Sequence, residues 1–119
     1  MGQPSLSMDG GIRVELHRSA GRGLHMPVVH EATKRRFALH LPQGEGELCY
    51  AMPAPGVLDL YHAGVSASLR GRGLAGTLVA AACEHARAEG LKLIPTCPYV
   101  AWWFEQHPEQ RTLLLEPDA

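Results

Sequence analysis

An α+β fold is predicted by a change in the spacing of apolar residues near the middle of the chain. Between residues 28 and 65, apolar and polar side chains alternate in short runs separated by turn residues, which is typical of antiparallel strands joined by hairpins. From residue 74 the apolar residues recur every four positions instead, which is typical of a helix. A short apolar run and a second helical pattern follow. We therefore predict an antiparallel meander followed by helix, strand and helix, with a β-α-β crossover in the second half.

The strands are expected in four short runs that precede the first helix. They cover residues 28–29, 37–41, 48–52 and 57–65. Turns are expected at 43–46 and 53–56, where Gly and Pro gather. In the last strand, period-two alternation predicts one shared face for Leu58, Leu60, His62 and Gly64.

Two helices are expected after the strands. The first has its apolar stripe at Leu74, Leu78, Ala82 and Ala86, and Gly90 is a typical residue for its end, which makes about four turns. A short strand at 91–96 follows. Pro98 then suits the first position of a second helix, whose inner stripe we expect to be Val100, Trp103, Phe104 and His107. Residues 113–115 form either a final strand or a frayed end.

The first 24 residues are expected to be an extension of the domain at 25–119. Residues 1–11 are polar and Gly-rich, and we expect them to be a mobile tail. Residues 12–16 alternate like a short strand, and a basic, Gly-rich link then runs through Arg22 and Gly23.

Composition limits the classes of function. The chain has 119 residues and a formal net charge of -1, which suits a single domain and excludes a generally basic, nucleic-acid-binding surface. Its three cysteines make no C-x-x-C motif, so we expect neither a disulfide framework nor a metal site. No run reaches the ~18 apolar residues of a membrane helix. We expect a cytoplasmic protein without a membrane partner, either a monomer or a weak dimer.

The segment from residue 66 to residue 77 predicts a local anion site. Glycines at 71, 73 and 76 allow a ligand to approach the backbone closely, and the start of the following helix offers free amides and the positive end of its dipole. Arg70 and Arg72 add full positive charges. Because several adjacent amides suit a pyrophosphate, we expect a phosphate-containing ligand here. The alternative is a Gly-rich turn without a ligand.

Three known glycine patterns fit parts of this loop. The spacing Gly71-x-Gly73-x-x-Gly76 matches a dinucleotide fingerprint, but five residues separate it from the expected strand end, where that fingerprint begins. The same outer glycines begin a P-loop, but Thr77 stands where its lysine is required. The third pattern is Arg70-x-x-Gly73-x-Ala75.

This third pattern resembles the Arg/Gln-x-x-Gly-x-Gly/Ala motif of the GNAT superfamily, the general-control-nonderepressible-related N-acetyltransferases. The order of His62, Val65, the loop at 69–75, Cys97-Pro98-Tyr99-Val100 and His107-Pro108-Glu109 is similar to its minimal, single-domain members, over roughly residues 28–112. The resemblance implies that the chain binds acetyl-CoA and transfers its acetyl group to a primary amine of a small molecule or peptide. It implies cofactor contacts from Val65, Arg70, Gly71, Arg72, Gly73, Leu74, Ala75, Cys97 and Tyr99.

Three side chains are candidates for the chemistry of acetyl transfer, which needs a base, a polarised thioester and a proton for the leaving thiolate. The imidazole of His62 can accept an amine proton near neutral pH, or it can be a hydrogen-bonded residue of the sheet. Cys97 precedes a helix, whose dipole favours a thiolate, so it is either an acyl-accepting nucleophile or a packed wall of the pocket. Many members of the resembled family use a tyrosine to protonate the thiolate, and this resemblance implies that role for Tyr99.

The chain departs from the resembled pattern at two places. Gly64 stands where that pattern has an acidic residue two places after the histidine, and the later part of the second helix reads Trp103-Phe104-Glu105, without a tyrosine. These departures leave a second hypothesis open, in which the chain is a CoA-binding or protein-interaction module of the same fold without turnover.

Overall fold

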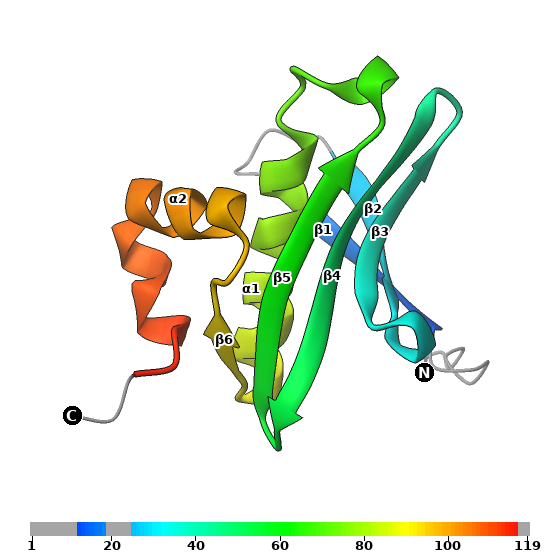
Figure 1. The fold of residues 1–119 in the computed structure, drawn as a ribbon. Helices are drawn as coiled ribbons and strands as arrows, with labels where there is room; N and C mark the ends of the chain where they lie inside the picture. The colour runs from blue at the N-terminus through cyan, green and yellow to red at the C-terminus, as the bar shows by residue number, and fades with distance from the viewer. Residues whose placement is uncertain (1–11, 19–24, 117–119) are drawn as a thin grey trace.

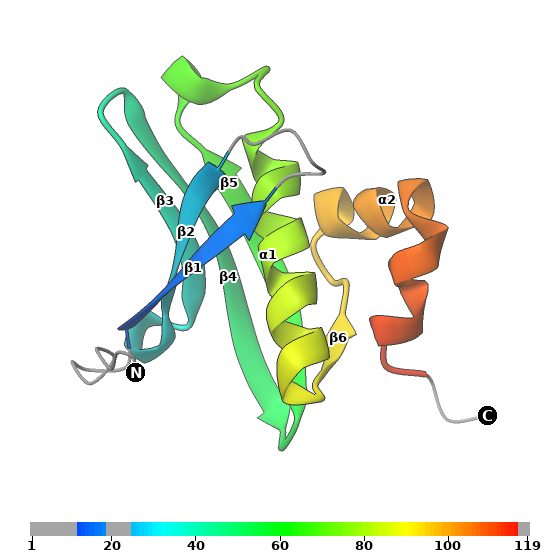
Figure 2. The ribbon, with the colours of Figure 1, turned by 180° about the vertical axis from the view of Figure 1, so that it is seen from behind.

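A computed structural model of the protein describes the backbone of residues 12–18 and 25–116 and the side chains of residues 27–116. Six strands form one sheet in sequence order, and the long helix α1 lies across one face of it (Figures 1 and 2). The tail expected at 1–11 and the link expected through Arg22 and Gly23 lie outside the described residues.

The sheet consists of a meander and one crossover. Five consecutive strands pair antiparallel: β1 (Ile12–Arg18), β2 (His25–Glu31), β3 (Arg36–Leu41), β4 (Gly44–Ala54) and β5 (Val57–Val65). After α1 the chain returns as β6 (Lys92–Ile94), which pairs parallel with β5. The predicted α+β fold and its β-α-β crossover are confirmed.

The turn predicted at 43–46 is wrong, because the glycines there belong to a strand. The turn is formed by Pro42 and Gln43, and β4 already begins at Gly44. A Cβ atom on Gly44 would lie 2.8 Å from the Cβ of Ser66, and one on Gly46 would lie 3.3 Å from Leu78 Cδ1. Glycine is therefore needed at these strand positions for close approach of the loop after β5 and of α1.

A β-bulge in β5 overturns the predicted common face of Leu60 and His62. Tyr50 pairs with Leu60, whereas the adjacent Cys49 pairs with His62, so Tyr61 is an extra residue on β5. Leu60 is fully buried, but the His62 side chain is 52% exposed. The bulge reverses the alternation, so that His62 and Gly64 lie on the face away from the core.

Two α-helices and their caps follow the predicted pattern closely. The first, α1, spans Leu74–Glu89 and ends at Gly90, whose φ of 70° is left-handed. The second, α2, spans Pro98–Gln106 and is followed by a 3-10 helix at Pro108–Leu113. The chain then returns to the sheet, where Leu114 makes a single parallel bridge with Leu93.

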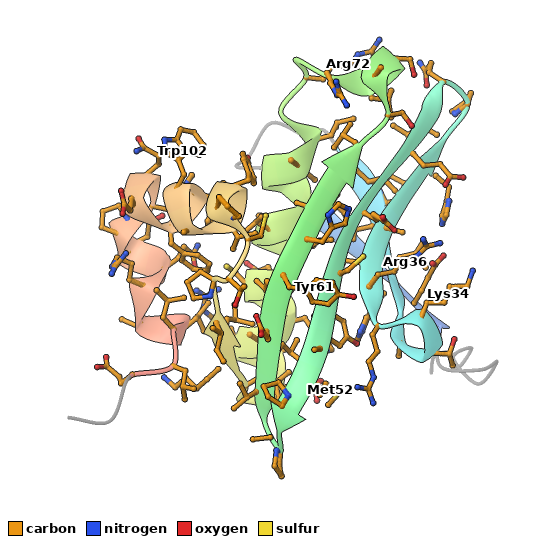
Figure 3. All side chains as sticks on the ribbon, in the orientation of Figure 1. Lys34, Arg36, Met52, Tyr61, Arg72 and Trp102 are labelled. Carbon is orange, nitrogen blue, oxygen red and sulfur yellow. The ribbon has the colours of Figure 1, made fainter. Side chains whose placement is uncertain are left out.

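The core lies between α1, α2 and the sheet. Its largest fully buried side chains are Phe37, Leu39, Leu48, Leu60, Leu69, Leu78, Leu93 and Phe104. Of the two adjacent tryptophans, Trp103 is buried and Trp102 is 53% exposed. Helix α2 therefore uses one indole for the core and presents the other to solvent (Figure 3).

The opposite face of β3, β4 and β5 carries no helix in the part of the chain that the structure describes (Figure 1). Charged side chains cross this open face. Glu31 accepts hydrogen bonds from Arg36 Nε at 2.5 Å and from His40 Nε2 at 2.8 Å, and His40 Nδ1 lies 3.3 Å from Glu45. The second donor group of Arg36 reaches Glu47 at 2.9 Å. This network joins β2, β3 and β4.

The network shifts the pKa values of two of its members in opposite directions. Burial opposes ionisation of Glu31, but the hydrogen bonds from His40 and Arg36 outweigh it, so the pKa of Glu31 is lowered. The hydrogen bond to Glu31, followed by that to Glu45, raises the pKa of His40 above its ordinary 6.5. Each shift means that the folded state favours the charged form.

We predict that the stabilising effect of His40 depends on pH. Because its pKa is raised on folding, its contribution is complete below the unfolded value near 6.5 and is lost as the pH rises through the folded value. Replacing His40→Gln should therefore lower the free energy of unfolding more at about pH 5.5 than at about pH 9. Urea denaturation of both proteins at both pH values measures this. An equal cost at the two pH values would contradict the assigned ion pair.

Candidate functional site

The loop between β5 and α1 is fastened to the neighbouring hairpin. A 3-10 turn at Ala67–Leu69 follows β5. Ser66 N–H donates to the Glu45 carbonyl at 2.8 Å, and Ser68 Oγ donates to the Gln43 carbonyl at 2.6 Å. Arg70 Nε donates back to the carbonyl of Val65 at 3.4 Å. The loop is therefore held at both its start and its middle.

Two glycines turn the chain from this loop into α1. Gly71 has a φ of 84° and Gly73, the N-cap of α1, has a φ of 72°, a region that side chains with a Cβ rarely adopt. Gly73 offers no side chain to cap α1, and the first turn of α1 contains no acidic residue. The first-turn amides and the positive end of the helix dipole are thus available to an anion.

A pocket of about 220 Å³ lies at this helix start. It brings together Val65, Leu69, Arg70, Gly71, Gly73, Leu74, Ala75 and Tyr99. Seven of these are expected cofactor contacts, and Leu69 is an additional wall. Two other expected contacts, Arg72 and Cys97, do not line the pocket, and Arg72 lies at the outer tip of the loop (Figure 3).

Helix α2 closes the pocket through contact with α1 at Gly76. A Cβ atom on Gly76 would lie 3.3 Å from the Tyr99 hydroxyl and 3.2 Å from Trp103 Nε1. Gly76 therefore permits the packing of the two helices, whereas the sequence suggested that it faces the ligand. Burial raises the pKa of Tyr99, so that its hydroxyl retains its proton over a wide pH range.

Cys97 lies where β5 and β6 separate. The parallel ladder ends at the pair Asp59 and Ile94, and the Cys97 amide then donates to the Leu60 carbonyl at 2.9 Å. Beyond this bond, among the described strands, the 61–65 edge of β5 has no partner on its β6 side. Cys97, which is only 7% exposed, lies beside this unpaired edge.

The third catalytic candidate, His62, lies on the open face of the sheet, next to Glu47 in the wall of a different pocket. This second pocket, of about 270 Å³, lies on the open face of the sheet and is lined by Arg36, Glu45, Gly46, Glu47, Gly64 and Ser66. Because successive strand residues face opposite sides, Val65 lines the first pocket while Gly64 and Ser66 line the second. Nε2 of His62 lies 3.5 Å from Glu47 Oε2.

Sequence reasoning missed Glu47, although a signal for it exists. With β4 begun at Gly44, alternation places Glu45 and Glu47 on the face opposite Leu48. The turn expected at 43–46 covered Glu45, and the strand expected only from residue 48 left out Glu47, so neither residue was placed on a strand.

Comparisons with known proteins agree on one family. The model of the GCN5-related N-acetyl-transferase family matches residues 36–113. Protein NATD1 of Gallus gallus is 30% identical over 89 residues, which cover 73% of this chain and 81% of NATD1. Protein NATD1 of Homo sapiens is also 30% identical over 89 residues, which cover 73% of this chain and 79% of that protein.

A solved structure shares the fold. The NMR structure of a GCN5-like protein from Staphylococcus aureus superposes with a TM-score of 0.58 at 21% identity, over 87% of this chain and 90% of that one. In the described part of this chain, no helix is long and apolar enough to cross a membrane. The motif at Arg70–Ala75, the sheet with its crossover and the match over residues 36–113 lead to one conclusion: the chain belongs to the GCN5-related N-acetyltransferase family, a family of acetyltransferases.

Proposed function

We propose that this chain transfers the acetyl group of acetyl-CoA to a primary amine of a small molecule or peptide. The observation that carries the proposal is the pocket at the start of α1. This pocket combines three features: a loop with two glycines in the left-handed region, a first helical turn without acidic residues, and the guanidinium group of Arg70. Such a cradle of amides beside one cation fits a pyrophosphate.

We assign successive parts of this cofactor to residues that follow one another along β5 and around the pocket. The backbone from Arg70 to Ala75 would hold the pyrophosphate, with Arg72 contributing charge at the loop tip. The 61–65 edge of β5, which ends at Val65, would run beside the pantetheine arm. Cys97 and Tyr99 would border the thioester, where β5 and β6 separate.

Acetyl-CoA supplies the activated acyl group, and residues of the chain transfer the protons. An alkylammonium acceptor loses two protons when it becomes an amide. In the proposed reaction, the His62 imidazole takes one proton and passes it to solvent, and the amine nitrogen then bonds to the carbonyl carbon as the C–S bond breaks. Tyr99, kept protonated by burial, would give its proton to the leaving thiolate, and the second amine proton, released to solvent, would restore the Tyr99 hydroxyl.

Three further expectations belong to this proposal. We assign the cofactor-binding domain to residues 25–119 and treat residues 1–24 as an extension, of which Ile12–Arg18 adds the outer strand of the sheet. Cys49, Cys83 and Cys97 are free thiols, which supports a reducing, cytoplasmic location. We further propose that the protein acts as a monomer or a weak dimer.

Turnover is the first prediction of this proposal. Incubating the protein with acetyl-CoA and a panel of polyamines, lysine-containing peptides and peptides with free N-termini should release free CoA thiol with at least one acceptor. The rate of thiol appearance, corrected for hydrolysis without acceptor, measures this. If calorimetry shows CoA binding but no acceptor raises thiol release, the chain is instead the non-catalytic CoA-binding module.

The second prediction concerns Gly73. A Cβ atom there would project into open space at the pocket and force a left-handed backbone on alanine, so Gly73→Ala should weaken CoA binding about tenfold or more, or ~1.4 kcal/mol. Isothermal titration calorimetry measures the change.

Gly90→Ala is the matched control. Gly90 lies at the far end of the same helix and also has a left-handed φ, of 70°. A Cβ atom added to Gly90 would likewise have no other atom within 4 Å. Both variants should lose about 1–2 kcal/mol of stability from backbone strain. Unchanged CoA affinity in Gly73→Ala, or an equal loss of affinity in both variants, would contradict the assigned pyrophosphate site.

The third prediction separates direct transfer from an acyl-enzyme. Because Cys97 is only 7% exposed, we propose direct transfer, with Cys97 packed as a wall beside the thioester. Intact-protein mass spectrometry after incubation with acetyl-CoA alone should show no acetyl adduct. An adduct that disappears in Cys97→Ala but persists in Cys49→Ala would establish Cys97 as the nucleophile and overturn direct transfer.

A further inference from the structure

The side chain of Glu47 is held in one orientation and faces His62. One carboxylate oxygen, Oε1, accepts a hydrogen bond from Arg36 at 2.9 Å, and Arg36 is itself fixed by Glu31 at 2.5 Å. The other oxygen, Oε2, lies 3.5 Å from His62 Nε2. This last distance suits an ion pair and is longer than an ordinary hydrogen bond, as is common for catalytic pairs before substrate binds.

Two features of β5 bring His62 to this carboxylate. The extra residue Tyr61 turns His62 from the core side to the open face, where Glu47 lies. Gly64 pairs directly with Glu47 across the two strands, and a Cβ atom on Gly64 would lie 3.1 Å from His62 Nε2. The imidazole therefore lies over Gly64, and the missing side chain leaves it room to reach Glu47.

We propose that Glu47 is a positioning residue for the acetyl transfer. Its carboxylate faces Nε2 of His62 and so favours the tautomer with the hydrogen on Nε2, which leaves the Nδ1 lone pair to accept the proton of the acceptor amine. Once His62 is protonated, the same carboxylate stabilises the imidazolium. The acceptor amine accordingly meets His62 from the open face of the sheet, on the side of β5 opposite Gly76 and α1.

This inference rests on the proposed function, because it needs His62 to act as the base. It does not rest on the stability of the fold, because His62 is half exposed and an exposed ion pair of this kind contributes little to folding. The role of Glu47 should therefore be visible in the rate and in the imidazole tautomer.

The kinetic test uses Glu47→Gln with the best acceptor from the panel. We expect kcat to fall about tenfold or more, a part of the ~100-fold or greater effect of a general base, with the KM for acetyl-CoA unchanged. Glu47→Asp keeps the carboxylate and should recover part of the lost kcat.

Glu45→Gln is the matched control. Glu45 lies on the same strand and lines the same pocket, but its carboxylate pairs with His40 and not with His62. The imidazole tautomer of His62 should match the wild type in this variant. Gly64→Ala provides a second route to the same result, since its Cβ would displace the imidazole without altering any charge. We expect it to lower kcat in the same direction as Glu47→Gln.

The spectroscopic test does not depend on turnover. The ¹⁵N chemical shifts of the His62 ring, assigned by the signal missing from His62→Gln, should report the tautomer with hydrogen on Nε2 in the wild type and a changed tautomer ratio in Glu47→Gln, but not in Glu45→Gln. An unchanged ratio overturns the proposal.

The outcomes distinguish failure of the positioning role of Glu47 from failure of the proposed function. If His62→Gln loses activity while Glu47→Gln keeps the wild-type rate, the positioning role fails and the proposed function stands. If His62→Gln retains full activity, His62 is not the base and the positioning role fails with it. If no protein variant, wild type included, acetylates any acceptor, the proposed function itself fails.

Discussion

The backbone of β5 is the constraint on which the rest of the structure depends. It pairs with β4 along its whole length but with β6 only from Val57 to Asp59, and the amide of Cys97 then ends the contact at Leu60. One extra residue, Tyr61, reverses the alternation at the same point. Before the bulge the strand buries Leu60 in the core. After it, Val65 lines the pocket at the start of α1 while His62 and Gly64 face the open side of the sheet.

Close approach through glycine allows a short chain to build both pockets around this strand. Gly44 admits Ser66, so that the loop after β5 is fastened to the β3–β4 hairpin, and Gly76 admits Tyr99 and Trp103, so that α2 closes against α1. Gly64 admits the His62 ring in the same way. In each case the small residue removes a side chain so that a neighbouring group can occupy its space, which is why these glycines are not turn residues.

The regular parts of the fold were predictable, and the irregular contacts were not. Helix α1 and the bounds of β5 follow from spacing alone, because their apolar patterns are long. The loop at 70–75 was found from its glycines and arginines. By contrast, a bulge leaves no mark in an alternating pattern, so His62 was placed on the wrong face. The strand position of Gly44 depends on Ser66, which is distant in sequence, and the pairing of Glu47 with Gly64 depends on register, which no local pattern specifies.

Register also changes the meaning of the missing acid at position 64. From the sequence, Gly64 looks like the loss of a catalytic group, and the shortness of the chain suggests an incomplete enzyme. In the sheet, the residue paired with Gly64 is Glu47, so a carboxylate is present beside His62 but comes from the neighbouring strand. A side chain at 64 would crowd the imidazole that Glu47 faces. The two positions are therefore alternatives: a carboxylate on β5 itself, or a glycine on β5 with the carboxylate supplied by β4. In the second arrangement, Arg36, itself held by Glu31, donates a hydrogen bond to one carboxylate oxygen of Glu47, and the other oxygen faces His62. The carboxylate is therefore oriented on both sides by residues of the sheet, and no additional residues are needed.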